Sequence, residues 1–226
     1  MAIGTFALRA VVGGLFVGHG LQKLRGSFGG PGIQGTTRMM ESLRLEPARR
    51  NAVLAALSET LGGAGVALGA GTPFSAAALI GAMTTAIRKV HLKQGLWNAG
   101  GGFEYNLVLV AAATAIVAEG PGGLSVDALI GRGKWGPLWA AAALGAGIAG
   151  STAVVELGHR RADAMGATAS GDAGASPAEA SGSGPSDDSG PSDEPGVDRG
   201  ADHVTDSAEA ATAQGLDPAE TADASI

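Results

Sequence analysis

The sequence predicts an all-α fold: a multi-pass transmembrane helical bundle followed by a disordered acidic tail. Its long apolar runs indicate spans, because a bilayer core about 30 Å thick needs roughly 20 mostly apolar helical residues. Backbone polar groups in lipid must be satisfied internally, which favours helix over strand. Five runs approach this length: 3–21, 52–70, 74–90, 104–118 and 137–157.

The basic residues between these runs predict the orientation. Eleven Lys and Arg follow the first, third and fifth runs, whereas the loop between the fourth and fifth holds only Arg132 and Lys134. The positive-inside rule then places the N-terminus outside and the C-terminal tail in the cytoplasm of a multi-pass cell-membrane protein. If one apolar run lay in the interface, the tail would change side.

Charge divides the chain at about residue 161. Residues 1–161 hold 14 Lys and Arg against 7 Asp and Glu, whereas 162–226 hold one Arg against 14 Asp and Glu. The segment 162–226 lacks the apolar periodicity needed to offset ordering entropy, so we expect a disordered tail. A partner hook, a regulatory segment and no specific use all remain open for it.

The composition and motifs exclude several chemistries. The chain has no cysteine, so it builds no disulfide, thiolate nucleophile or Cys-ligated cluster. It has no H-E-x-x-H spacing, phosphate-binding glycine loop or G-x-S-x-G motif, so we predict no protein-built metal site. The basic residues follow helix ends rather than forming a stripe, which argues against nucleic acid as a partner.

Two connecting segments have their own patterns. Residues 33–44 alternate apolar and charged side chains, which suits an interfacial amphipathic helix or a solvated loop about equally. The loop 93–103 contains Gly100, Gly101 and Gly102, which permit a sharp turn beside the membrane. Trp97 in this loop, and Trp135 near the other face, suit aromatic belts at the two interfaces.

Ionisable residues inside the predicted spans are the candidate site. Arg9 and Glu59 lie within the first two spans, where a charge costs at least about 2.5 kcal/mol unless it is paired or hydrated. We expect them to pair, although Arg9 could instead extend to the interface and Glu59 could be neutral packing. Arg88 is either a membrane anchor or part of the site.

Further polar residues fall near the expected cytoplasmic boundary, at the ends of four spans. Together they predict a polar intramembrane pocket, in which His19 and Glu104 could exchange protons or bind a carbonyl head group. The full set of pocket candidates is Arg9, His19, Lys23, Glu59, Arg88, His91, Glu104 and Asn106.

Four motifs, taken in this order and spacing, resemble the DoxX family of small bacterial membrane proteins. The resemblance covers about residues 3–130. The motifs are Arg9 with His19-Gly20-x-x-Lys23-Leu24-x-Gly26; Glu59-x-x-Gly62-Gly63; Gly101-Gly102-Phe103-Glu104-Tyr105-Asn106; and Gly120-Pro121-Gly122 with Leu124-Ser125-Val126-Asp127.

The resemblance implies a four-helix membrane core at 1–130, to which 131–161 adds a transmembrane helix and 162–226 the tail. Some family members are linked to a thiosulfate:quinone oxidoreductase. A mycobacterial member is associated with a membrane complex containing a superoxide dismutase and a sulfurtransferase. The resemblance therefore implies a subunit or anchor of a membrane redox system, more a non-catalytic subunit than an enzyme alone.

Such a subunit would hold a soluble oxidoreductase of these types, or a quinone-like molecule, against the polar pocket. Any sulfur chemistry would belong to the partner, because this chain lacks cysteine. A small-molecule carrier or permeability protein, and a membrane scaffold that acts through its tail, remain open as alternatives.

Overall fold

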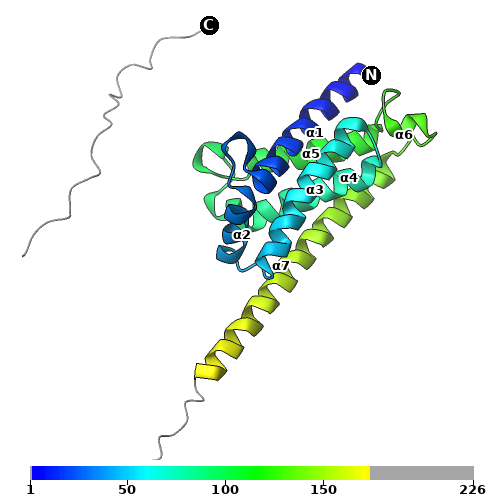
Figure 1. Cartoon of the computed structure of the whole chain (residues 1–226). Coiled ribbons are helices and arrows are strands. Elements are labelled where there is room, and N and C mark those ends of the chain that lie inside the picture. The colour runs from blue at the N-terminus through cyan, green and yellow to red at the C-terminus, as the bar shows by residue number, and fades with distance from the viewer. Residues whose placement is uncertain (1, 174–226) are drawn as a thin grey trace, which may run out of the picture. The chain divides into compact units, whose positions relative to one another are not determined.

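The computed structural model describes residues 2–173, and within that range the chain is helical with no strand. Figure 1 shows long helices running side by side, which confirms the predicted helical bundle. The tail prediction for 174–226 lies outside the described residues. At 162–173 that prediction is wrong, because the last helix continues through them.

Helices α1 (Ala2–Arg25) and α3 (Ala48–Leu68) pack along most of their length. Glycine permits this approach: a Cβ at Gly13 would lie 2.5 Å from the Gly63 carbonyl oxygen. A Cβ at Gly63 would lie 2.8 Å from the Phe16 Cβ. Small residues let helix backbones in a membrane come this close.

Helix α4 (Thr72–Ala86) is the central element, in contact with α3, α5 and α7. It continues into a π-helical turn, η2 (Ile87–His91), so that the rod reaches the end of the predicted third span. Helix α5 (Glu104–Glu119) has 16 residues and begins at Glu104. At 1.5 Å per residue it is about 24 Å long, shorter than the bilayer core.

Helix α7 (Pro137–Ala173) is the longest element, at 37 residues. It packs on α4 and α5, so the helix that the sequence placed after a four-helix core is part of the same bundle. At Gly147 the helices approach closely, since a Cβ there would lie 2.6 Å from the Ile80 Cγ2.

The connections complete the bundle. The segment predicted to be either an interfacial helix or a loop is a helix, α2 (Gly32–Ser42), which packs on α1 and α3. Before it, Ser27–Gly29 (η1) forms a single 3₁₀ turn between glycine and proline neighbours, residue types that break regular helix. The glycine loop contains two more such turns, Leu92–Gln94 (η3) and Asn98–Gly100 (η4), and a short helix, α6 (Val126–Leu129), lies between α5 and α7.

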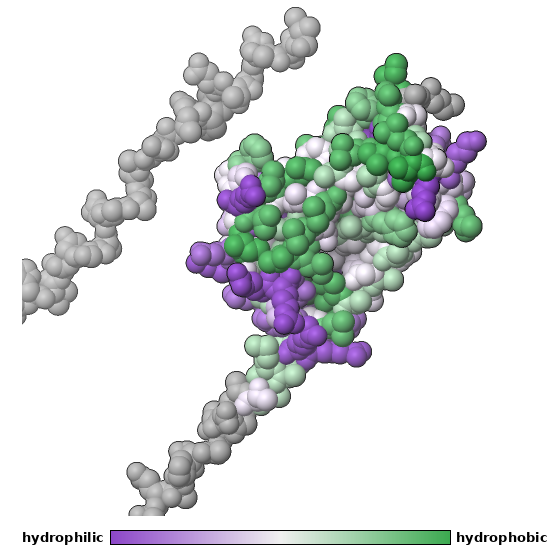
Figure 2. Space-filling view, turned by 45° about the vertical axis from the view of Figure 1, so that its right-hand side comes forward, coloured by the Kyte–Doolittle hydropathy of each residue, from purple (hydrophilic) through white to green (hydrophobic). Residues whose placement is uncertain are grey.

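The outside of the bundle is apolar. Helices α1, α3 and α7 contain stretches long and apolar enough to cross a membrane, at Ile3–Arg25, Ala48–Leu68 and Pro137–Thr168. Large side chains such as Val11, Leu61 and Val108 are exposed around it, and hydrophilic side chains gather toward its ends (Figure 2). Exposed apolar surface on this scale marks a lipid-facing wall, so the chain is a multi-pass membrane protein.

Candidate functional site

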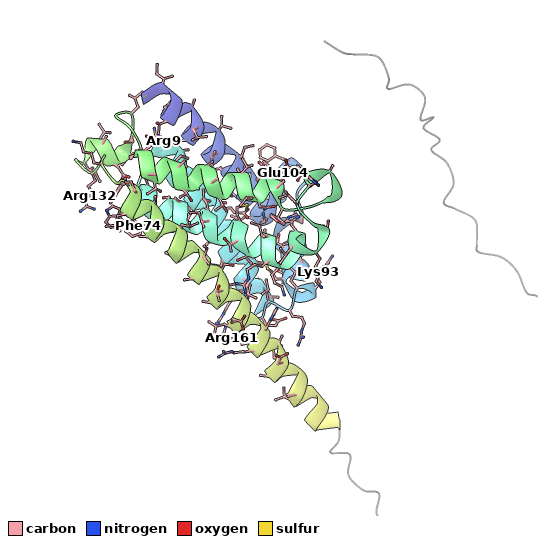
Figure 3. All side chains as sticks on the ribbon, turned by 180° about the vertical axis from the view of Figure 1, so that it is seen from behind. Arg9, Phe74, Lys93, Glu104, Arg132 and Arg161 are labelled. Carbon is pink, nitrogen blue, oxygen red and sulfur yellow. The ribbon has the colours of Figure 1, made fainter. Side chains whose placement is uncertain are left out.

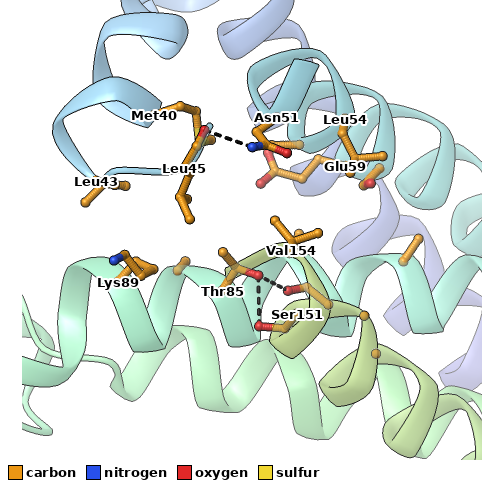
Figure 4. Close-up of a pocket in the computed structure, with 18 of the residues that line it drawn as sticks. Met40, Leu43, Leu45, Asn51, Leu54, Glu59, Thr85, Lys89, Ser151 and Val154 are labelled. Atoms are coloured by element: carbon orange, nitrogen blue, oxygen red, sulfur yellow. Dashed lines mark hydrogen bonds between the residues drawn. The ribbon is translucent and has the colours of Figure 1, made fainter. Parts of the chain in front are cut away.

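A cavity of about 360 Å³ lies between α2, α3, α4 and α7. Its walls are almost entirely apolar, with small residues on α4 and α7 and larger ones on α2 and α3. Figure 4 shows the space that these side chains surround. The apolar lining includes Met39, Met40, Leu43, Leu45, Leu54, Ala77, Ala78, Gly81, Ala82, Gly147, Gly150 and Val154.

An ion pair between Lys23 and Glu59 lies at the cavity wall. The Lys23 Nζ is 2.6 Å from the Glu59 Oε2, and the two side chains are 23% and 4% exposed. Lys23 stands in the last turn of α1, where the helix dipole favours a cation. Since both residues also line the cavity, a bound molecule can accept a hydrogen bond from the ammonium without separating the pair.

Helices α4 and α7 contribute neutral polar groups to the same cavity. The Thr85 hydroxyl donates to the Gly81 carbonyl and lies 2.9 Å from the Ser151 hydroxyl (Figure 4).

Near the end of α4, the Lys89 Nζ is 2.6 Å from the His159 Nε2. An ammonium can only donate, so Nε2 accepts and the ring carries its proton on Nδ1.

The expected pair of Arg9 with Glu59 is wrong. Arg9 is fully buried, but its Nη2 donates to the Leu124 carbonyl at 2.5 Å, and the guanidinium lies against Gly69. Gly69 is ten residues beyond Glu59 on the same chain segment, or about 15 Å along a helix. Figure 3 shows Arg9 near one end of the bundle and Glu104 toward the other.

The other predicted site residues make local contacts away from the cavity lining. Arg88 donates to the Thr152 hydroxyl at 3.1 Å, and Asn106 donates to the Met83 sulfur at 3.3 Å. The remaining contacts are those of His19 with Gln22 (3.1 Å), His91 with the Gly101 carbonyl (2.7 Å) and Glu104 with the Asn98 amide (3.0 Å). His19 and Glu104 thus have separate partners, and of the eight candidates only Lys23 and Glu59 line the cavity.

Sequence reasoning missed five polar lining residues: Asn51, Ser58, Thr85, Lys89 and Ser151. The hydroxyls carry no charge and give little signal in an apolar run, whereas Lys89 served only as one of the basic residues that predict the orientation. Within residues 2–173, no three His, Asp or Glu side chains come together as a metal site would need.

A second buried polar cluster surrounds Asp127 at the end of the bundle that holds Arg9. Its carboxylate accepts hydrogen bonds from the Gly71 and Thr72 amides, at 2.7 and 2.9 Å, and from the Trp135 indole at 2.9 Å. Burial alone would raise the pKa of the Asp127 carboxyl, but the hydrogen bonds outweigh it and hold that pKa below its ordinary value. Asp127 therefore fixes the α5–α7 connection onto the start of α4.

One comparison with known proteins finds a match, to a protein family. The sequence model of the DoxX family matches residues 4–92, which span α1, α2, α3, α4 and η2. The match ends before the last two motifs of the resemblance, and helix α7 lies outside it. No curated protein and no solved structure matches the chain significantly.

Proposed function

Because residues 4–92 match the DoxX family, we propose that the chain is a membrane-embedded subunit or anchor of a redox system. In this role it holds a quinone-like molecule in the cavity beside Lys23 and Glu59. The observation that carries the proposal is the combination of an apolar cavity with a charged pair in its wall.

The residues present suit such a molecule. Ligand sites are typically clefts of about 300–1,000 Å³ with apolar walls and a few placed polar groups. The alanine- and glycine-rich walls suit the ring and chain of a lipid-soluble quinone. The Lys23 ammonium and the Ser151 hydroxyl, which accepts from Thr85, are donors for its carbonyl oxygens.

Three of the four cavity walls, α2, α3 and α4, lie within the DoxX-matched residues, as does Lys23. The proposed ligand would therefore lie mainly against the residues that match the DoxX family. Any electron-transferring or sulfur-transferring enzyme would be a separate soluble partner, of the superoxide dismutase or sulfurtransferase type. In the proposed orientation it would bind from the cytoplasm, where eleven basic residues gather.

Binding of a short-chain naphthoquinone to the full chain in nanodiscs, measured by equilibrium dialysis, tests the proposal. The informative variant carries both Lys23→Met and Glu59→Gln, which removes the donor without leaving a buried charge unpaired. The matched control carries Lys93→Met and Glu41→Gln, the same changes at exposed positions. A hydrogen bond to a charged group contributes about 1.5–3 kcal/mol, so affinity should fall by roughly tenfold or more only in the cavity variant.

Equal affinity in the two double variants, or no binding by the wild-type chain, would reject the quinone proposal. Melting temperatures of both variants show whether the bundle remains folded. If the wild-type chain alone moved small solutes across liposome membranes, the carrier alternative would replace the redox one.

A further inference from the structure

Lys89, at one end of the cavity, is a cation that has no acidic partner among residues 2–173. It stands in the π-helical turn η2, it is half-buried, and its Nζ contacts the uncharged His159 ring at 2.6 Å. Figure 4 shows it well apart from Glu59 across the drawn cavity. Glu59 is already paired with Lys23, so it does not neutralise Lys89.

The charged groups around Lys89 are predominantly cations. Lys93, Arg44 and Arg88 lie close enough to repel its ammonium. Two carboxylates face these neighbours: Asp163 pairs with Arg44, and Glu156 lies 4.0 Å from Arg88. Four cations against two carboxylates leave this corner with a surplus of two positive charges.

An anion at this corner would relieve that repulsion, and the adjoining surface indicates what else the anion carries. Met39, Leu43 and Val90 line the same cavity as Lys89, so an apolar chain has walls to lie against. Figure 2 shows hydrophilic side chains gathered at the lower end of the bundle directly beside hydrophobic surface. Basic pockets between helices at a membrane boundary are suited to phosphate head groups.

We propose that the Lys89 corner binds the phosphate of an anionic phospholipid whose acyl chain enters the cavity from its Lys89 end. His159 and the paired carboxylates of Glu156 and Asp163 come from α7, which lies outside the DoxX-matched residues. The site therefore goes beyond the proposed quinone function and does not rest on it. The two ligands share the apolar walls, so they compete.

Native mass spectrometry of the delipidated full chain tests this site, by titration with phosphatidylglycerol or phosphatidylcholine of identical chains. Phosphatidylglycerol should be retained about fivefold more strongly, the effect of roughly one basic residue facing an anionic head group. Lys89→Gln should abolish the preference, Lys89→Arg should keep it, and the control Lys134→Gln should leave it unchanged. Lys134 is exposed on the α5–α7 connection.

Equal retention of the two lipids by the wild-type chain would overturn the proposal. This comparison uses the wild-type chain alone, so it does not depend on whether a variant folds. So would a Lys89→Gln chain with the same preference as Lys134→Gln. Inorganic phosphate separates the two sources of the anion: if it binds through Lys89 and phosphatidylglycerol does not displace it, the site takes a free anion and the lipid assignment is wrong. Displacement by the lipid supports the assignment.

Discussion

Two adjacent glycines of α1 should respond in opposite ways to the same substitution. A Cβ added at Gly13 would lie 2.5 Å from the Gly63 carbonyl oxygen and 2.6 Å from the Ala67 amide nitrogen, whereas a Cβ at Gly14 would meet nothing within 4 Å. Gly13→Ala must therefore push α1 away from α3, and Gly14→Ala only fills open space.

The structure sets the size of the effect. Ordinary contact begins at 3.4 Å, so Gly13→Ala requires a separation of about 0.9 Å between the contacting atoms. Overpacking destabilises a fold by about 1–3 kcal/mol. Alanine inside a helix stabilises it by about 0.5–1 kcal/mol relative to glycine. Gly13→Ala should lose roughly 1–2 kcal/mol of unfolding free energy, and Gly14→Ala should lose none or gain up to about 1 kcal/mol.

Thermal unfolding of the two full-length variants in one detergent, followed by far-ultraviolet circular dichroism, measures this difference. One kcal/mol shifts the melting temperature by about 2–4 °C in a chain of this size, so variants that differ by about 1–3 kcal/mol should differ by roughly 2–12 °C. Indistinguishable melting temperatures would refute the close packing of α1 on α3 at Gly13.

Other predictions concern the charged groups. Lys23→Met should lower the free energy of unfolding by about 3–5 kcal/mol, because it leaves the Glu59 carboxylate buried without its partner. Adding Glu59→Gln should recover at least about 2 kcal/mol of that loss. If the losses of the two single variants, measured by unfolding titrations, simply add in the double variant, the ion pair is contradicted. Because the pKa of Asp127 is depressed in the folded chain, its carboxylate contributes stability that is complete above the unfolded pKa of 3.8 and is lost as the pH falls through the folded pKa. Asp127→Asn should remove this acid-dependent loss of stability from melting curves. In intact cells, an impermeant maleimide should label a cysteine at Lys134 but not one at Arg50, and the reverse pattern would invert the orientation.

The helical bundle followed directly from the sequence, because long apolar runs and glycine breaks are local signals. The choice between glycines was not local. Gly14 and Gly18 have the spacing of a packing motif, yet a Cβ at either would meet nothing within 4 Å, and Gly13, Gly20 and Gly63 form the contact instead. Every face of a glycine-rich apolar helix looks similar until the neighbouring helix is placed.

The candidate site was predicted only in part for a similar reason. Depth along the membrane can be read from the chain, and it brought Lys23 and Glu59 into consideration. The lateral position of a side chain cannot be read from the sequence. The prediction therefore paired Arg9 with Glu59, whereas the structure places Arg9 against Gly69 and Leu124. Ser151 lies in the cavity wall because α7 packs on α4, and no periodicity in the sequence predicts this tertiary contact.

Photocrosslinking with an azido-quinone tests the central proposal most directly. The full chain in nanodiscs would be irradiated with the probe, digested and mapped by peptide mass spectrometry, with an unreactive quinone as competitor. We predict competitor-sensitive adducts on the cavity segments 39–59, 77–90 and 146–154, reduced in the Lys23→Met, Glu59→Gln double variant. Adducts confined to the Asp127 end of the bundle, or unaffected by the competitor, would contradict a quinone site beside Lys23 and Glu59.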